Sequence, residues 1–316
     1  MNNYEVLTKI VEEKAVIRHV SKHRNPDGSM DIAGNLKLWN DAVARFETIK
    51  LWDKTPNFDD RDPNQIEPNI IFIPNQNGAK RGTIIVACGG GFETRTGCEG
   101  FNIAKKFVDE GFNCAILTYR LKPYGRKDAM DDMQRAIRLL RYKKDELNIT
   151  DKICCMGFSA GGMLSGNCAT HFDYGKNESN DIVERQSSRP DMIVMGYGAF
   201  CFAGIPGGFF CDPFSDMIRN PFFKDKAELL YYSPEVNITR ETPPFFIWQT
   251  NSDDPRNSFT MGSALTAMGI PFEMHLFPEG VHGLALADGN NDLNMDIPSV
   301  AQWVNLCVNW LNNQCL

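Results

Sequence analysis

The chain has 316 residues, 42% of them hydrophobic, and a formal net charge of −7. This length can bury one large core or two small ones, and the composition is that of an ordinary globular protein. The acidic balance argues against nucleic-acid binding, which needs a basic surface, and no apolar run reaches the roughly 18–20 residues of a membrane span.

Residues 1–7 contain no basic segment leading into an apolar run, so we expect no signal peptide and a cytoplasmic protein. The ten cysteines are scattered, and Cys88, Cys114, Cys154 and Cys155 lie inside apolar runs. Without an export signal, such cysteines are typical of buried reduced thiols.

The chain begins with two predicted helices and two predicted strands. Apolar side chains recur at helical spacing over residues 3–20, and a second short helix is predicted over 35–45. Strands are predicted over 46–52 and 69–73, with a loop rich in Pro, Asp and Asn between them.

From residue 82 onward, continuous apolar strands alternate with helices. The predicted strands are 83–88, 113–118, 152–156, 191–195, 244–249 and 271–277, and the predicted helices are 98–110, 128–147, 160–171, 257–269 and 296–313. This alternation predicts an α/β fold with a mostly parallel sheet covered by helices on both faces.

Two boundaries follow from the pattern. Residues 1–45 are predicted to be an N-terminal helical extension, and 46–316 an α/β domain. Within that domain, residues 197–240 interrupt the alternation and are expected to form an insertion over the carboxyl edge of the strands, where α/β proteins bind ligands. The phenylalanines of this insertion are Phe200, Phe202, Phe209, Phe210, Phe214, Phe222 and Phe223.

A serine stands between glycines at the junction of a predicted strand and a predicted helix. Residues 156–162 read M-G-F-S-A-G-G, which places Ser159 in a G-x-S-x-G pattern. The pattern is typical of a nucleophile on a sharp turn, where side chains at the flanking positions would collide with neighbouring backbone. A glycine-rich turn that opens a helix is the alternative interpretation.

A nucleophilic serine needs a base, and the chain has five histidines. His19 and His23 precede the sheet, His171 lies late in the helix after the serine, and His275 lies inside a predicted strand. His282 follows the last predicted strand on a glycine-flanked loop, so we predict that it is the base.

The acid that orients this base is expected after the preceding strand. Asp253 and Asp254 follow the strand predicted over 244–249, and one of them should hold the imidazole in the required tautomer. We choose Asp253 and keep Asp254 as the alternative.

The glycines at 89–91 follow the first long strand and fit neither common phosphate-binding glycine pattern. Glycine lets backbone N–H groups face a ligand without a Cβ clash. The N–H groups of Gly90, Gly91 and Ala160 are therefore predicted to hold an oxyanion.

These motifs together resemble the α/β-hydrolase superfamily of serine esterases, in the branch of hormone-sensitive lipases and bacterial acetyl xylan esterases. The H-G-G-G or P-G-G-G motif of that branch corresponds to C-G-G-G-F at 88–92, its Y-R motif to Tyr119 and Arg120, and its elbow to G-F-S-A-G-G at 157–162. The resemblance covers about residues 46–313. Cys88 stands where relatives have His or Pro, and the loop after Asp253 is shortened.

The resemblance implies a serine carboxylesterase acting on short-chain acyl esters, with O-acetyl groups on carbohydrate as the expected substrates. A small-molecule or oligosaccharide ester is then the partner, with no nucleic acid and no membrane, and the sequence leaves a homo-oligomer open. No metal and no cofactor are expected, because the chain has neither an H-E-x-x-H motif nor a calcium-loop spacing. The alternatives are a prolyl-oligopeptidase-like peptidase and a non-catalytic binding protein of the same fold.

Overall fold

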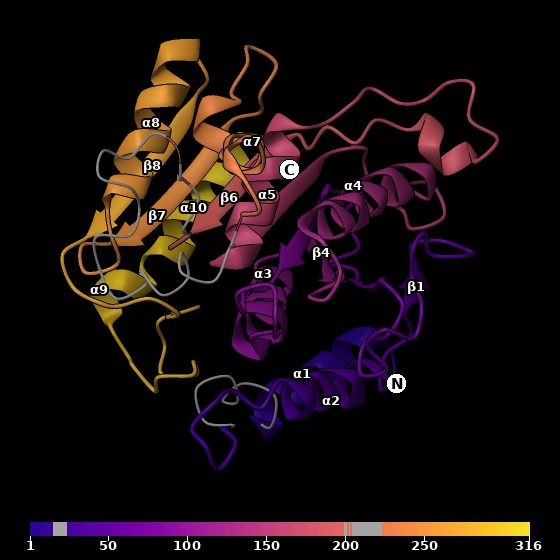
Figure 1. Ribbon diagram of the computed structural model, residues 1–316, viewed down its shortest axis with the longest axis horizontal. Helices are drawn as coiled ribbons and strands as arrows, with labels where there is room; N and C mark the ends of the chain where they lie inside the picture. The colour runs from indigo at the N-terminus through magenta and orange to yellow at the C-terminus, as the bar shows by residue number, and fades with distance from the viewer. Residues whose placement is uncertain (15–23, 199–200, 202, 204–222) are drawn as a thin grey trace.

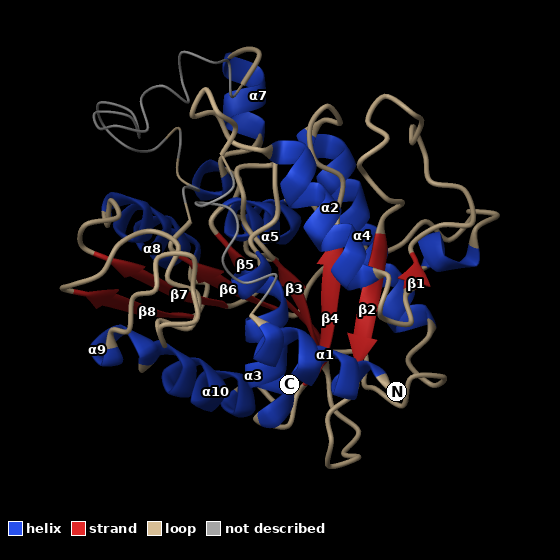
Figure 2. Cartoon of the chain, turned by 90° about the horizontal axis from the view of Figure 1, so that it is seen from below, coloured by secondary structure: helices blue, strands red, loops and turns tan. Residues whose placement is uncertain are grey.

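A computed structural model describes residues 1–14, 24–198, 201, 203 and 223–316 of the chain. In this part of the chain, eight strands form one sheet in the order β1-β2-β4-β3-β5-β6-β7-β8. The strands are β1 (Ile49–Lys50), β2 (Asn69–Ile73), β3 (Thr83–Ala87), β4 (Asn113–Thr118), β5 (Ile153–Phe158), β6 (Met192–Gly196), β7 (Phe245–Thr250) and β8 (Phe272–Phe277). Figure 2 shows the sheet crossing the molecule from β8 to β1.

The sheet is parallel from β4 to β8 and antiparallel at its other edge. β2 pairs antiparallel with both β4 and β1, whereas every pair from β4 to β8 is parallel. The carboxyl ends of six strands therefore meet at one edge, which is where α/β sheets place their sites. The predicted α/β fold with a mostly parallel sheet is confirmed.

Helices cover both faces of the sheet. They are α1 (Asn3–Glu13), α2 (Ile32–Val43), η1 (Cys98–Asn102), α3 (Ile103–Asp109), α4 (Arg126–Tyr142), α5 (Ala160–Thr170), η2 (Ile182–Arg185), α7 (Lys226–Tyr231), η4 (Pro234–Val236), α8 (Arg256–Met268), α9 (Pro298–Ala301) and α10 (Trp303–Asn313). In Figure 2, α1, α3 and α10 lie on one face, and α4, α5 and α8 lie on the other.

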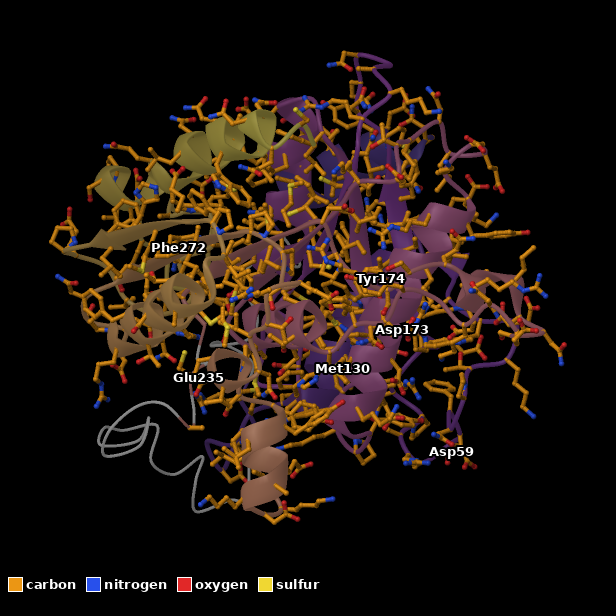
Figure 3. The ribbon with its side chains drawn as sticks, turned by 90° about the horizontal axis from the view of Figure 1, so that it is seen from above. Asp59, Met130, Asp173, Tyr174, Glu235 and Phe272 are labelled. Atoms are coloured by element: carbon orange, nitrogen blue, oxygen red, sulfur yellow. The ribbon has the colours of Figure 1, made fainter. Side chains whose placement is uncertain are left out.

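The apolar strands supply two cores at once, because successive side chains point to opposite faces. Ile84 and Val86 join the core under α1, α3 and α10, whereas Ile85 and Ala87 join the core under α4, α5 and α8. Met130 of α4 marks the second face in Figure 3. Continuous apolar strands are thus explained by burial on both sides.

The N-terminal helices share the first core with the sheet. Leu7 and Ile10 of α1 are fully buried there with Trp39 of α2. The helix predicted over 3–20 ends earlier, at Glu13, where Lys14 takes a left-handed conformation with φ of 54°. Residues 15–23 lie outside the described part of the chain, and a boundary at residue 45 stays a prediction.

Several other predicted elements differ from the structure. The strand predicted over 46–52 is the two-residue β1, and the helix predicted over 98–110 begins as the π-helix η1. The helix predicted over 296–313 divides into α9 and α10. Tertiary packing decides such ends, because the apolar pattern alone does not mark them.

The predicted insertion over 197–240 is described only in part. Its described portion contains α7 and η4 (Figure 1), and Phe223 packs against the second core. The other phenylalanines named for this segment lie outside the described residues: Phe200, Phe202, Phe209, Phe210, Phe214 and Phe222. Its placement over the strand edge stays a prediction.

Nine cysteines fall in the described residues, and each is a free thiol. Cys315 is exposed, whereas the others are buried: Cys88, Cys98, Cys114, Cys154, Cys155, Cys168, Cys201 and Cys307. Among the helices described, none is both long and apolar enough to cross a bilayer. The cytoplasmic location stays a prediction.

Candidate active site

Ser159 lies on a sharp turn between β5 and α5. Its backbone has φ of 52° and ψ of −121°, a conformation that costs a non-glycine residue about 1–3 kcal/mol. A Cβ at Gly157 would lie 2.0 Å from the carbonyl oxygen of Gly161, and a Cβ at Gly161 would lie 2.0 Å from that of Ala87. The two glycines therefore allow the close packing that holds the serine in this conformation.

The loop after β8 brings His282 to this serine. The Nε2 atom of His282 lies 2.8 Å from the Oγ atom of Ser159. Its Nδ1 atom lies 3.0 Å and 2.9 Å from the two carboxylate oxygens of Asp253. Serine, imidazole and carboxylate thus form one continuous hydrogen-bonded chain.

The two adjacent aspartates have different partners. Asp253 follows β7 and is 9% exposed, and its carboxylate contacts His282. The carboxylate of Asp254 instead binds the guanidinium of Arg256, at 2.6 Å and 2.7 Å. The geometry therefore brings Asp253, and not Asp254, to the imidazole.

Opposing effects act on the ionisation of His282. Burial lowers the pKa of the imidazole, but the hydrogen bond to Asp253 and the negative charges of Asp253 and Glu99 outweigh burial. The pKa of His282 consequently lies above its ordinary value. Such surroundings favour the imidazolium, the form that a base takes after it has accepted a proton.

The glycine loop (residues 89–91) packs beside the serine. A Cβ at Gly89 would lie 2.7 Å from the Cβ of Ser159. Gly90 and Gly91 have φ of 124° and 64°, which glycine adopts readily. Within the described residues, the N–H groups of Gly90, Gly91 and Ala160 donate to no protein acceptor, so they are available to a ligand oxygen.

Two residues that the sequence interpretation missed lie behind the glycine loop. Glu99 of η1 accepts hydrogen bonds from the N–H of Gly89 at 2.6 Å and from the hydroxyl of Tyr197 at 2.8 Å. The hydroxyl of Tyr197 in turn accepts the N–H of Ala285, at 2.9 Å. The available signal for Glu99 was a single charged residue in the segment 98–104, whose other side chains are uncharged.

The remaining histidines lie elsewhere. The Nε2 atom of His171 contacts the carbonyl of Tyr231 at 2.6 Å, and that of His275 contacts Glu273 at 2.8 Å. His19 and His23 lie outside the described residues. Over residues 1–14, 24–198, 201, 203 and 223–316, no three His, Cys, Asp or Glu side chains gather as metal ligands.

The sequence profile of the family described as BD-FAE matches residues 70–259, which is more than half of the chain. The chain belongs to the BD-FAE family. This BD-FAE protein is also 32% identical, over 231 residues, to an endo-1,4-beta-xylanase B of Butyrivibrio fibrisolvens. The matched region is 70% of this chain and 35% of the xylanase, so the chain spans about a third of that relative's length.

Solved structures similar to the BD-FAE chain include hydrolases. An acetyl ester-xyloside bifunctional hydrolase from Caldicellulosiruptor lactoaceticus has a TM-score of 0.73 and 32% identity, covering 84% of this chain and 96% of that one. A carboxylesterase from Lactobacillus plantarum shares the fold, with a TM-score of 0.61 and 23% identity over 78% of this chain and 92% of that one.

These comparisons confirm the α/β-hydrolase fold and the resemblance to acetyl xylan esterase-like enzymes. The BD-FAE domain described here is a carboxylic ester hydrolase.

Proposed function

We propose that this BD-FAE protein hydrolyses short-chain acyl esters with Ser159 as nucleophile, His282 as general base and Asp253 as the orienting acid. The proposal rests on one observation, the hydrogen-bonded chain from Ser159 through His282 to Asp253. The same arrangement of serine, histidine and aspartate carries out acyl transfer on unrelated folds. In each case the geometry defines the role of each of the three residues.

In the first half-reaction, Nε2 of His282 accepts the Ser159 proton while Oγ attacks the ester carbonyl carbon. The N–H groups of Gly90, Gly91 and Ala160 stabilise the negative charge that develops on the carbonyl oxygen. His282 then donates its proton to the leaving alcohol oxygen, which releases the alcohol and leaves an acyl-serine.

In the second half-reaction, water takes the place of the alcohol. His282 accepts a proton from the water as it attacks the acyl carbon, and the same N–H groups stabilise the second oxyanion. The proton returns to Oγ of Ser159 when the carboxylic acid leaves. Throughout both steps, the carboxylate of Asp253 stabilises the imidazolium.

We propose O-acetyl groups on carbohydrate as the substrate class. Support comes from the similarity of the chain to two enzymes, an endo-1,4-beta-xylanase B and an acetyl ester-xyloside bifunctional hydrolase. An acetylated xylo-oligosaccharide is therefore the first substrate to test.

The test is a hydrolysis panel of p-nitrophenyl acetate through octanoate, acetylated xylo-oligosaccharides and a prolyl anilide. The wild type should hydrolyse acetate faster than octanoate and release acetate from the oligosaccharide, and Ser159→Ala should abolish both activities. A wild type that hydrolyses no ester, or a fully active Ser159→Ala variant, would overturn the proposal. Cleavage of the anilide alone would favour the peptidase alternative.

Asp253→Asn and Asp254→Asn form a matched pair for the acid. Asp253→Asn should lower kcat about 10⁴-fold, by analogy with the aspartate of serine proteases. Asp254→Asn should stay within about threefold of the wild type, because its carboxylate binds Arg256 and not the imidazole. The reverse ranking would assign the acid to Asp254.

A further inference from the structure

The carboxylate of Glu99 is buried directly behind the glycine loop. The residue is 2% exposed, and its Oε2 atom accepts the N–H of Gly89 at 2.6 Å. A Cβ at Gly89 would lie 2.7 Å from this oxygen and 2.7 Å from the Cβ of Ser159. Gly89 therefore lies between the carboxylate and the proposed nucleophile, with no room for a side chain.

The other oxygen of Glu99 connects to the histidine loop (residues 282–285). Oε1 accepts the hydroxyl proton of Tyr197 at 2.8 Å, and the Tyr197 oxygen accepts the N–H of Ala285 at 2.9 Å. The Tyr197 ring also packs edge-on against the imidazole of His282, with 5.2 Å between ring centres. One carboxylate thus contacts the glycine loop directly and the histidine loop through a single phenol.

We propose that Glu99 is a positioning residue that holds the glycine loop and the histidine loop in register, through its hydrogen bonds to Gly89 and Tyr197. This inference rests on the proposed function, because both loops matter only if Ser159 attacks an ester.

Burial makes a purely structural role for this carboxylate costly. A buried carboxylate loses its hydration, and an apolar side chain of similar volume would often stabilise the fold as well or better. Glu99 instead receives two hydrogen bonds, one from each loop system, and bonds to a charged acceptor are stronger and shorter than neutral ones. A buried carboxylate whose partners belong to a proposed active site is typical of a functional residue.

Two carboxylates in the described part of the chain act on the imidazole. His282 faces the carboxylates of Asp253 and Glu99. Among the residues that the structure describes, phenols and thiols also face Glu99, and they stay neutral because burial raises the pKa of each: Tyr119, Tyr197, Cys88 and Cys98. Burial raises the pKa of the Glu99 carboxyl, and the hydrogen bonds from Tyr197 and Gly89 act in the opposite direction. Replacing Glu99 by glutamine removes the charge that its carboxylate carries when ionised.

The test compares Glu99→Gln, Tyr197→Phe and the double variant, with p-nitrophenyl acetate as substrate and a phosphonate ester to count reactive serines. Each single variant should lower kcat per reactive serine about 10- to 100-fold with KM within about twofold, since loss of a whole oxyanion donor costs 10²–10³. In the double variant, kcat per reactive serine should be no more than about threefold below that of the less active single variant. The two effects should not add, because both residues belong to one series of hydrogen bonds.

The pH dependence of kcat/KM distinguishes an electrostatic effect of Glu99 on His282 from an effect on loop position alone. Glu99→Gln should move the acid limb of kcat/KM to lower pH, because the imidazolium loses a negative neighbour. Tyr197→Phe keeps the charge and should leave the limb in place. A general loss of packing would move neither limb.

Asp132→Asn is the matched control, because Asp132 is also a buried carboxylate. Its carboxylate binds the guanidinium of Arg120 and contacts neither the glycine loop nor the histidine loop in the described residues. The substitution should lower the melting temperature while kcat per reactive serine stays unchanged. A kcat loss there equal to that of Glu99→Gln would overturn the proposal.

The remaining outcomes are also decisive. A wild type without esterase activity rejects the proposed function and this inference together. An active wild type with Glu99→Gln unchanged in kcat and pH profile rejects the positioning role and leaves the esterase intact. If Glu99→Gln does not fold, Tyr197→Phe decides, and an unchanged kcat in that variant rejects the role.

Discussion

At the scale of single residues, two opposing requirements act on the protonation of the His282 imidazole. It has to be neutral to accept the serine proton, yet its surroundings favour the protonated form. Burial lowers its pKa, but the Asp253 hydrogen bond and the charges of Asp253 and Glu99 raise it further than burial lowers it. The same contacts that stabilise the imidazolium during the reaction therefore reduce the fraction of active enzyme in mildly acidic solution.

We expect kcat/KM for p-nitrophenyl acetate to rise with pH through a midpoint above 6.5, the ordinary histidine value. The raised pKa also stabilises the fold below that ordinary value, and this contribution is lost as pH rises through the raised pKa. Asp254→Asn serves as the control and should keep the wild-type midpoint. A wild-type midpoint at or below 6.5 would contradict the expectation.

Sequence reasoning reached Ser159 and His282 because short motifs mark them. Glycines beside a serine, and a histidine on a glycine-flanked loop, are visible without a structure. Glu99 and Tyr197 carry no such mark. Their hydrogen bond joins residues 98 positions apart, and it exists only after β6 and η1 have packed together. The choice between Asp253 and Asp254 was open for the same reason.

At the scale of elements, the turn between β5 and α5 depends on atoms from three segments. Gly161 packs its backbone against Ala87 at the end of β3, with 2.0 Å between a Cβ placed there and the carbonyl oxygen. At Gly162, the nearest atom to such a Cβ is the carbonyl oxygen of Gly157, at 3.3 Å. Neighbouring glycines of one helix therefore differ greatly in the room around them.

Gly161→Ala should destabilise the protein by about 3 kcal/mol or more, because the new methyl group would force strand β3 and helix α5 apart. Gly162→Ala should stay within about 1 kcal/mol of the wild type, since the helix propensity of alanine offsets the tight contact. Urea denaturation of both variants measures the difference. Equal free energies of unfolding would refute this account of the turn.

Two strands agree with the sequence prediction residue for residue. β2 and β4 match the predicted ranges because each is a short apolar run with clear ends. The apolar pattern does not encode strand direction, so the antiparallel pairing of β2 with β4 and β1 could not be read from it. The short helix α7 buries no residue, and it therefore gave no periodic signal.

At the scale of the whole molecule, the N-terminal helices complete a core that the later strands begin. Val6, Leu7 and Ile10 of α1 are buried in the cluster that contains Trp303 of α10. In Figure 1, α1 and α3 lie side by side although their segments are far apart in the sequence, and they also contact one another. The first helix is therefore a structural part of the fold.

Leu7→Ala should lower the free energy of unfolding by about 2–5 kcal/mol, because it removes a fully buried side chain and leaves a cavity. Glu12→Ala, on the exposed side of the same helix, should change it by less than about 0.5 kcal/mol. Urea denaturation followed by circular dichroism gives both values. A Leu7→Ala variant as stable as Glu12→Ala would show that α1 contributes little to the core.

The buried cysteines can report local opening of the fold through their rates of alkylation. Each of the eight buried thiols is shielded from an alkylating reagent until the segment around it separates from the core, and they are distributed over strands, helices and loops. The exposed Cys315 reacts without any opening and calibrates the intrinsic rate. The order in which a mass label accumulates on the described thiols therefore maps which layers of the fold separate first, with no probe introduced by mutation.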